Sequence, residues 1–222
     1  MREGLGYEVY TNKDVYFGYF SRNQRHGKGK LIKHATNETY TGQFYQGMRH
    51  GYGAWRKEGS EFHYSGMWSN NKPWGYGILR SHIGDVFEGN FHNGYKHGTG
   101  METYKDGGTY VGNFKDGQPE GFGRLTSLDG SVFEGLFIKG QKDGRGKWTI
   151  PIVIERRIKG RMIKLDSGGN LAEWEGTVVN NRVEGHGNEH WSSGVEYRGE
   201  FLDNKRHGYG RMIQRDNTVY EG

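Results

Sequence analysis

With 222 residues the chain is long enough for a large domain, but its apolar fraction of 32% excludes a conventional two-layer core, since globular domains typically contain roughly 45 to 50%. The lack of cysteine excludes disulfides and thiolate chemistry and fits an intracellular protein. A net charge of +5 permits acidic partners without selecting one, and an aromatic content of 14% argues against a disordered chain.

The pattern aromatic-x-Gly-x-aromatic recurs along the chain with a period of 23 or 24 residues and one exception. The copies begin at Tyr16, Tyr40, Tyr64, Phe87, Tyr110, Phe133, Trp174 and Tyr197. Each is followed by a Gly-x-Gly, which begins at Gly27, Gly51, Gly75, Gly98, Gly121, Gly144, Gly185 and Gly208. Residues 1–15 resemble a partial repeat and another begins at residue 220, so we predict one repeat array over residues 1–222.

The spacing inside each copy predicts strands. Tyr40, Gly42 and Phe44 are two residues apart, so they share one face of a strand, whereas a helix would scatter them. In the second strand of a repeat, Gly27 and Gly29 also share a face. We therefore expect rings to fill the space that glycines leave in neighbouring strands.

The turns give a second indication. Three residues after the second aromatic position there is always Gly or Asn, the residue types that tolerate positive φ. These residues are Asn23, Gly47, Asn71, Gly94, Gly117, Gly140, Asn181 and Asn204. At the opposite turns we expect the same role for Asn37, Gly59, Gly84, Gly107, Gly130, Gly194 and Asn217. The predicted fold is all-β: an elongated, single-layer antiparallel β-meander of about nine hairpins, twisted into a curved ribbon.

One repeat is longer than the others. The step from Gly135 to Gly176 is 41 residues, and the extra residues lie within 147–173. A β-branched run at 150–154 followed by basic residues predicts a basic extended hairpin. Its basic residues are Arg156, Arg157, Lys159, Arg161 and Lys164. The insertion is either a tolerated loop extension or a partner-binding element.

These repeats resemble the MORN family (membrane occupation and recognition nexus), whose repeat runs close to YxGxFxxGxxHGxG. Residues 40–53 and 197–210 match that pattern almost completely. The resemblance implies a curved single-layer sheet and a role in cytoskeletal or membrane-associated assemblies, such as the radial spokes of cilia. The family histidine is present at His26, His50, His97 and His207 and is replaced at Trp74, Glu120, Asp143 and Glu184.

Three sets of residues are candidate partner-binding groups. The first is an aromatic face: Tyr40, Phe44, Tyr64, Trp68, Phe87, Phe91, Tyr110 and Phe114. The second is the basic set of the insertion given above. The third is a basic rim, whose residues stand just before Gly-x-Gly: Arg25, Arg49, Lys96 and Arg206. The alternative for the rim is a set of solvated turn charges without a partner.

The pattern offers no catalytic, cofactor or metal site. Equivalent histidines in adjacent repeats should lie roughly 10 Å apart, too far to share a zinc ion. Repeated carboxylates on a one-layer ribbon do not form a cleft, and the Gly-x-Gly pairs continue into strands instead of opening a helix. We expect no enzyme activity, no small-molecule substrate and no nucleic-acid partner.

The expected function is a structural scaffold, a protein-interaction subunit of an intracellular cytoskeletal assembly, specifically a ciliary or flagellar axoneme with radial-spoke-like components. Homotypic pairing of sheet edges is expected as well. The alternative is a membrane-apposed adaptor that binds phosphoinositides on an anionic surface through the basic rim. A third reading is an accessory domain of a larger enzyme.

Overall fold

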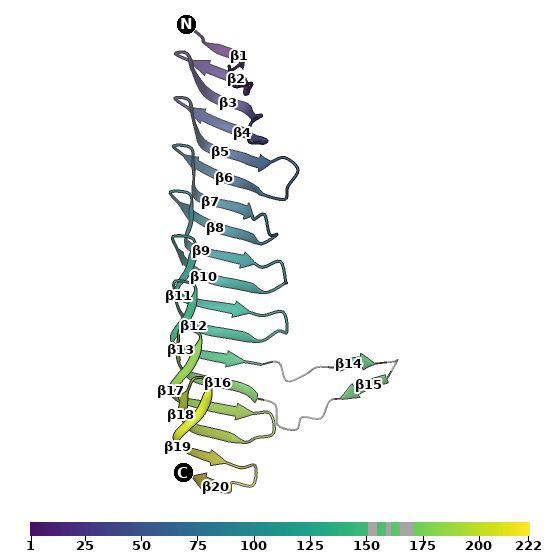
Figure 1. The fold of residues 1–222 in the computed structure, drawn as a ribbon, viewed down its shortest axis with the longest axis vertical. Helices are drawn as coiled ribbons and strands as arrows, with labels where there is room; N and C mark the ends of the chain where they lie inside the picture. Colours follow the sequence, from purple (N-terminus) through teal and green to yellow (C-terminus); the bar gives the residue numbers. More distant parts are fainter. Residues whose placement is uncertain (151–154, 159–160, 165–170) are drawn as a thin grey trace. The chain divides into compact units, whose positions relative to one another are not determined.

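The computed structural model describes residues 1–150, 155–158, 161–164 and 171–222. These residues form strands and turns and contain no helix, which confirms the all-β prediction (Figure 1). Eighteen strands belong to one antiparallel sheet and two to a small separate sheet. Within the described residues no helix has the length and apolarity needed to cross a membrane.

The chain divides into a first unit, Met1–Gly107 with Asn113–Gln118, and a second unit, Gly108–Gly112 with Pro119–Gly222. The strands of the first unit are β1 (Gly4–Val9), β2 (Val15–Ser21), β3 (Gln24–Lys33), β4 (Glu38–Tyr45), β5 (Met48–Lys57), β6 (His63–Ser69), β7 (Lys72–Arg80), β8 (Val86–His92) and β9 (Tyr95–Thr103). Residues of both units make up β10 (Thr109–Lys115).

The remaining strands are β11 (Gln118–Thr126), β12 (Val132–Ile138), β13 (Gln141–Thr149), β14 (Glu155–Ile158), β15 (Arg161–Lys164), β16 (Leu171–Val179), β17 (Arg182–Trp191), β18 (Glu196–Leu202), β19 (Lys205–Ile213) and β20 (Val219–Glu221). Within each unit consecutive hairpins pair side by side, apart from the pair β14 and β15, so the predicted meander is confirmed.

The tight turns have the geometry that the sequence predicted. At the turn between β6 and β7, Asn70 has φ 48° and Asn71 has φ 67°. Positive φ at both central positions is the mark of a type I′ hairpin, whose twist matches that of the strands. All eight predicted turn residues have positive φ, and so has the residue before each. The opposite turns use a single positive-φ residue, such as Gly84, whose amide donates to the Ser81 carbonyl at 3.1 Å.

The two glycines of each Gly-x-Gly serve different purposes. Gly53 lies under the Tyr40 ring, because a Cβ there would lie 2.2 Å from the Tyr40 hydroxyl oxygen. Gly51, in contrast, has φ 66° and occupies a β-bulge, where the register shifts between Gly42 and Phe44 on the partner strand. The expectation that rings fill the space at both glycines is therefore correct for the second one and wrong for the first, where the backbone conformation requires glycine.

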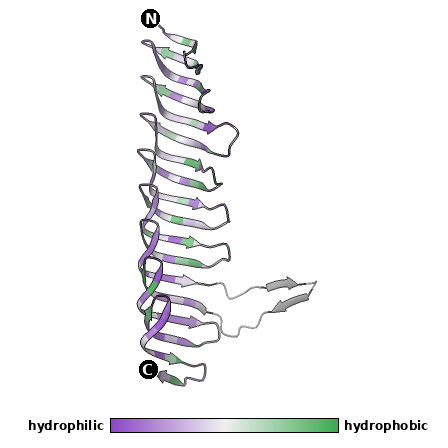
Figure 2. Cartoon of the chain, in the orientation of Figure 1, coloured by the Kyte–Doolittle hydropathy of each residue, from purple (hydrophilic) through white to green (hydrophobic). Residues whose placement is uncertain are grey.

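The core consists of rings packed edge to face along the face of the sheet that carries them, here called the ring face. Tyr40 contacts Phe44 of its own repeat, with centroids 5.1 Å apart, and Trp68 of the next repeat, with centroids 5.3 Å apart. Figure 2 shows short apolar and polar bands alternating along the strands. Each repeat thus completes its core with one neighbour, as in other one-dimensional repeat proteins.

Replacing Asn71 with alanine is expected to lower the free energy of unfolding by about 2 kcal/mol, because alanine is strained at φ 67° and cannot accept a hydrogen bond. Asn71 Oδ1 accepts the Arg49 amide at 2.9 Å. Asn71→Gly relieves the strain but not the lost acceptor, so we expect about half the effect. Urea unfolding of both variants checks this; equal losses would contradict the backbone argument.

Candidate interaction surfaces

The eight rings of the predicted aromatic face are buried. Tyr40, Phe44, Tyr64, Trp68, Phe87, Phe91, Tyr110 and Phe114 are each exposed by only 0 to 4%. They fill the core of the ribbon and leave almost no surface for a partner. This burial corrects the prediction that they form a binding face, because the bare glycines let each ring lie flat against the sheet.

The four residues of the basic rim lie over rings of the ring face. The Arg25 guanidinium is 5.4 Å from the centre of the Phe44 ring, and that of Arg49 is 4.3 Å from the Trp68 ring. The Lys96 amine is 5.4 Å from the Phe87 ring and forms an ion pair with Glu102. Arg206 lies 4.6 Å from the Tyr197 ring. The rim is therefore part of the packing, as cation–π partners of the core.

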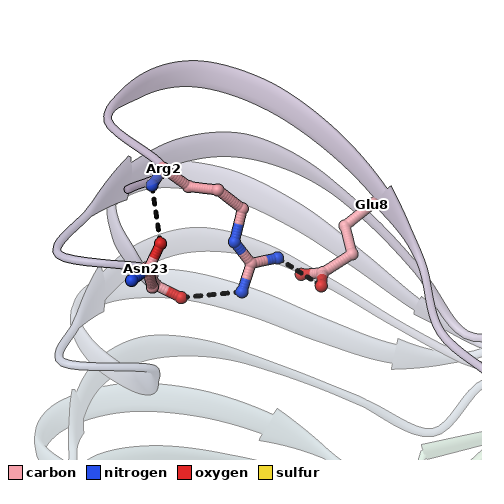
Figure 3. A network of polar contacts seen from close by, with 3 residues as sticks. All are labelled: Arg2, Glu8 and Asn23. Atoms are coloured by element: carbon pink, nitrogen blue, oxygen red, sulfur yellow. Dashed lines mark hydrogen bonds and ion pairs between the residues drawn. The ribbon is translucent and has the colours of Figure 1, made fainter.

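The rim arginines also connect neighbouring repeats. Arg25 donates to the Gly47 carbonyl at 2.7 Å, and Arg49 to the Asn71 carbonyl at 2.8 Å. Arg2 makes the same contact with Asn23 at 2.9 Å and forms an ion pair with Glu8 (Figure 3). Each of these hydrogen bonds therefore joins a basic side chain to the tight turn of the following repeat. This role was not predicted, although its signal, a basic residue two positions after the turn, is present in the sequence.

Burial changes the acidity of the rim residue Arg49 and of Lys142, which stands at the matching position two residues after Gly140. Burial under the neighbouring repeat lowers the pKa of Arg49, and burial also lowers the pKa of Lys142, whose amine lies 4.6 Å from the Trp148 ring. Both changes follow from desolvation of the charged form. These two cations therefore contribute mainly to the packing of the fold and less to an exposed, positively charged surface.

Replacing Arg49 with methionine is expected to lower the free energy of unfolding by about 2 kcal/mol, because the cation–π contacts and the bond to the Asn71 carbonyl are lost together. Arg124→Met is the matched control: Arg124 is exposed and has an ion pair with Glu134 at 3.3 Å, so we expect less than about 0.5 kcal/mol. Urea unfolding at low and high salt measures both. A loss for Arg49→Met that disappears in high salt would contradict a packing role.

Three replacements of the family histidine have a structural purpose. Glu120 accepts the Lys139 amide at 2.8 Å, Asp143 the Asn180 amide at 3.2 Å, and Glu184 the Asp203 amide at 3.2 Å. Each carboxylate caps the tight turn of the next repeat. Two of the retained histidines pack against a ring instead: the centroids of the His26 and His50 rings lie 5.4 and 5.7 Å from that of Tyr45. Among the described residues no three metal-binding side chains converge.

Two short strands of the insertion pair with each other, as predicted, whereas residues 151–154 of the predicted β-branched run lie outside the described residues. β14 pairs with β15 in antiparallel register, with Arg156 opposite Ile163 and Arg157 opposite Met162. Arg161 and Lys164 are the first and last residues of β15. Lys159 lies outside the described residues. Partner binding by this hairpin stays a prediction.

The face opposite the rings, here called the back face, carries exposed apolar side chains that the sequence analysis did not single out. In the first unit Phe17, Tyr19 and Tyr52 are 54, 51 and 61% exposed. They occupy the positions beside the repeat glycines, so period-two alternation alone would have placed them opposite the buried rings. Together with Leu5 they border a channel of about 580 Å³.

A second groove lies on the ring face of the first unit. It has a volume of about 630 Å³ and is lined by two arginines of the rim, Arg25 and Arg49, and by acidic residues that include Asp14 and Glu38. Tyr10, Leu31 and Trp55 supply its apolar part. Because this groove carries charges of both signs, it suits a zwitterionic or polar ligand. The back-face channel differs in being bordered by apolar side chains.

Comparison with known proteins bears on these surfaces only at the family level. A search of curated protein sequences finds no match. The TCP domain of Drosophila melanogaster SAS-4, solved with a proline-rich motif of Ana2, is 9% identical and has a TM-score of 0.27, over 98% of this chain and 88% of that one. A streptogramin B lyase is 12% identical with a TM-score of 0.16, over 99 and 83% of the two chains. At these TM-scores neither structure informs the fold or the function.

The family model described as "MORN repeat" matches eight segments, residues 16–33, 40–56, 64–86, 87–109, 110–132, 133–152, 174–196 and 197–219. Each segment begins at the ring that covers the glycines of its repeat, the feature on which the single sheet depends. Because the segments span well over half of the chain, the protein belongs to the MORN-repeat family.

Proposed function

We propose that the protein is a non-enzymatic scaffold, a protein-interaction subunit of an intracellular cytoskeletal assembly, and specifically of a ciliary or flagellar axonemal complex of the radial-spoke kind. MORN repeats form a non-catalytic scaffold that mediates contacts with proteins or membranes. The axonemal assignment rests on the cytoskeletal and ciliary roles that the resemblance to the MORN family implies.

One observation carries the scaffold proposal: the repeats satisfy their packing internally and leave the back face free. The rings, the rim cations and the turn caps all bind within or between neighbouring repeats. Several of the described back-face positions carry large exposed apolar side chains. Such exposed side chains beside one another are typical of interaction surfaces.

The test is proximity labelling in the native cell with a biotin ligase fused to the chain, with the free ligase as control. Labelled neighbours should be axonemal proteins, and the fusion should stay with the axoneme when isolated cilia are extracted with detergent. A labelled set that consists of soluble or membrane proteins, together with release by detergent, would overturn the axonemal assignment.

Homotypic edge pairing is kept as part of the proposal. Of the strands that the structure describes, β1 pairs with β2 and β20 pairs with β19. Backbone groups along an open sheet edge recruit further strands. Sedimentation over a range of concentrations should show self-association; a monomer at every concentration would count against it.

The alternative function is a membrane-apposed adaptor that binds phosphoinositides through the basic rim. In its favour, the basic residues Arg25, Arg49 and Lys96 are separated by whole numbers of repeats, one repeat between the first two and two repeats between the last two. Against it, these cations already lie over rings and bind carbonyl or carboxylate oxygens. Flotation with phosphoinositide vesicles decides: salt-sensitive binding by the folded chain would favour the membrane.

A further inference from the structure

The back-face channel of the first unit has a floor of bare backbone. Gly18 is directly opposite Gly29, Gly29 opposite Gly42, and Gly42 opposite Gly53, so one row of glycines crosses β2 to β5. Rows of side chains stand on either side of this glycine row. Phe17, Lys30, Thr41 and Ala54 form one wall, and Tyr19, Lys28, Gln43 and Tyr52 form the other.

The width of the channel selects the shape of its occupant. Side chains two residues apart on a strand are about 6.6 to 6.8 Å apart, which defines the distance between the two walls. An α-helix with its side chains is roughly 10 to 12 Å across and does not fit between them. An extended chain does fit, and four strands about 4.8 Å apart give room for about four of its residues.

The fold does not require the apolar walls. The position of Phe17 is taken in other repeats by Thr41 or Glu88, and that of Tyr52 by Lys28 or Thr99. In the second unit the corresponding glycine row, Gly176, Gly187 and Gly199, floors a channel of about 410 Å³ with different walls. Those walls include Arg145, Glu175, His186, Arg198 and Glu200. The same backbone thus carries either polar or apolar walls.

The charged side chains of the first-unit channel indicate which class of ligand it binds. Lys28 and Lys30 are exposed and flank Gly29 on opposite walls of the first-unit channel. None of the described residues that line this channel is acidic. A second copy of the same surface would bring lysines against lysines, which disfavours self-association through this face.

We propose that the back-face channel of the first unit binds an extended segment of a partner protein, with apolar side chains between the aromatic walls and flanking aspartate or glutamate residues on Lys28 and Lys30. Exposed Tyr and Phe side chains supply contact area at low entropic cost, and the bare glycine floor lets the ligand backbone approach closely. This inference rests on the proposed scaffold function and names the class of partner.

The experiment is a selection of random twelve-residue peptides by phage display on the full chain, about twelve residues being ample for a four-residue core with flanks. Selected peptides should contain apolar residues flanked by Asp or Glu. Tyr19→Thr combined with Tyr52→Thr, which introduces the residues found at the matching positions Thr177 and Thr99, should weaken their binding at least about ten-fold. Lys28→Glu should weaken binding and its salt dependence.

Tyr209→Thr is the matched control in the second unit, where Tyr209 lines the polar channel, and it should change affinity by less than about two-fold. Circular dichroism and thermal unfolding check that the variants fold. A benzophenone on a selected peptide, cross-linked to the unaltered chain and located by mass spectrometry, should mark β2 to β5 even if a variant fails to fold.

Selection of basic peptides, no enrichment, equal binding by the Tyr19 and Tyr52 double variant, or cross-links elsewhere would each overturn the inference. Vesicles of phosphatidylserine and phosphatidylcholine form a second arm: tight binding that depends on Tyr19 and Tyr52, without peptide enrichment, would assign the surface to a membrane. These results are independent of proximity labelling, so failure of the channel leaves the scaffold proposal standing.

Discussion

Gly53→Ala is expected to lower the free energy of unfolding by about 3 kcal/mol or more. An added Cβ would lie 2.2 Å from the Tyr40 hydroxyl oxygen and 2.5 Å from its ring. The ring cannot withdraw, because it is held between Phe44 and Trp68 and its hydroxyl donates to the Gln43 carbonyl at 2.9 Å.

Gly47→Asn is the control for Gly53→Ala. Gly47 has φ 79° at a tight turn, the position that Asn23 and Asn71 occupy in other repeats with φ 65 and 67°. We therefore expect a change within about 0.5 kcal/mol. Urea unfolding followed by circular dichroism measures both variants. A Gly53→Ala variant as stable as the parent chain would show that the ring can move, and would contradict the account of the core.

Alkaline pH is expected to unfold the chain through its buried tyrosines. Burial raises the pKa of Tyr16, Tyr40 and Tyr110 to about 12, and it raises the pKa of Tyr64 as well. The ordinary value, 10.0, applies in the unfolded chain. Because the folded-state pKa is the higher one, stability is complete below about pH 10 and falls as the pH rises toward about 12.

Each of these tyrosines should contribute on the order of 2 kcal/mol to that loss. Urea unfolding at rising pH, with tyrosinate absorbance recorded in parallel, measures it. Tyr40→Phe tests the cause: Phe87 and Phe133 occupy the same position in other repeats, so the variant should fold, lose about 1 kcal/mol at neutral pH and decline less steeply in alkali. An unchanged pH dependence would contradict the assignment.

Much of the backbone followed from local chemistry. The turn residues are a clear case: Asn71 and Gly94 both adopt positive φ, and the choice of Asn or Gly at that point could be read without knowledge of packing. The pairing of β14 with β15 was likewise predicted, from the basic residues that they carry. The structure adds the register: Gly42 lies opposite Gly53, and a Cβ at either position would meet the Tyr40 ring.

Exposure, in contrast, could not be read from the residue types. Tyr40 and Tyr52 are both tyrosines in the same hairpin, yet one is 2% and the other 61% exposed. The alternation separates their faces, but only the packing of repeats shows which face is covered. Arg49 was predicted as part of a free rim for the same reason, and its position over the Trp68 ring depends on the following repeat.

By itself the sequence determined the all-β repeat, its period, its turns and its family, because glycine, asparagine and aromatic residues constrain the backbone over a few neighbouring positions. Only the tertiary structure showed that the recurring rings and the rim cations pack inside the fold. It also showed that positions that differ between repeats, such as Tyr19 and Lys28, face solvent. Both results required contacts between residues about one repeat apart in the chain, which local pattern does not encode.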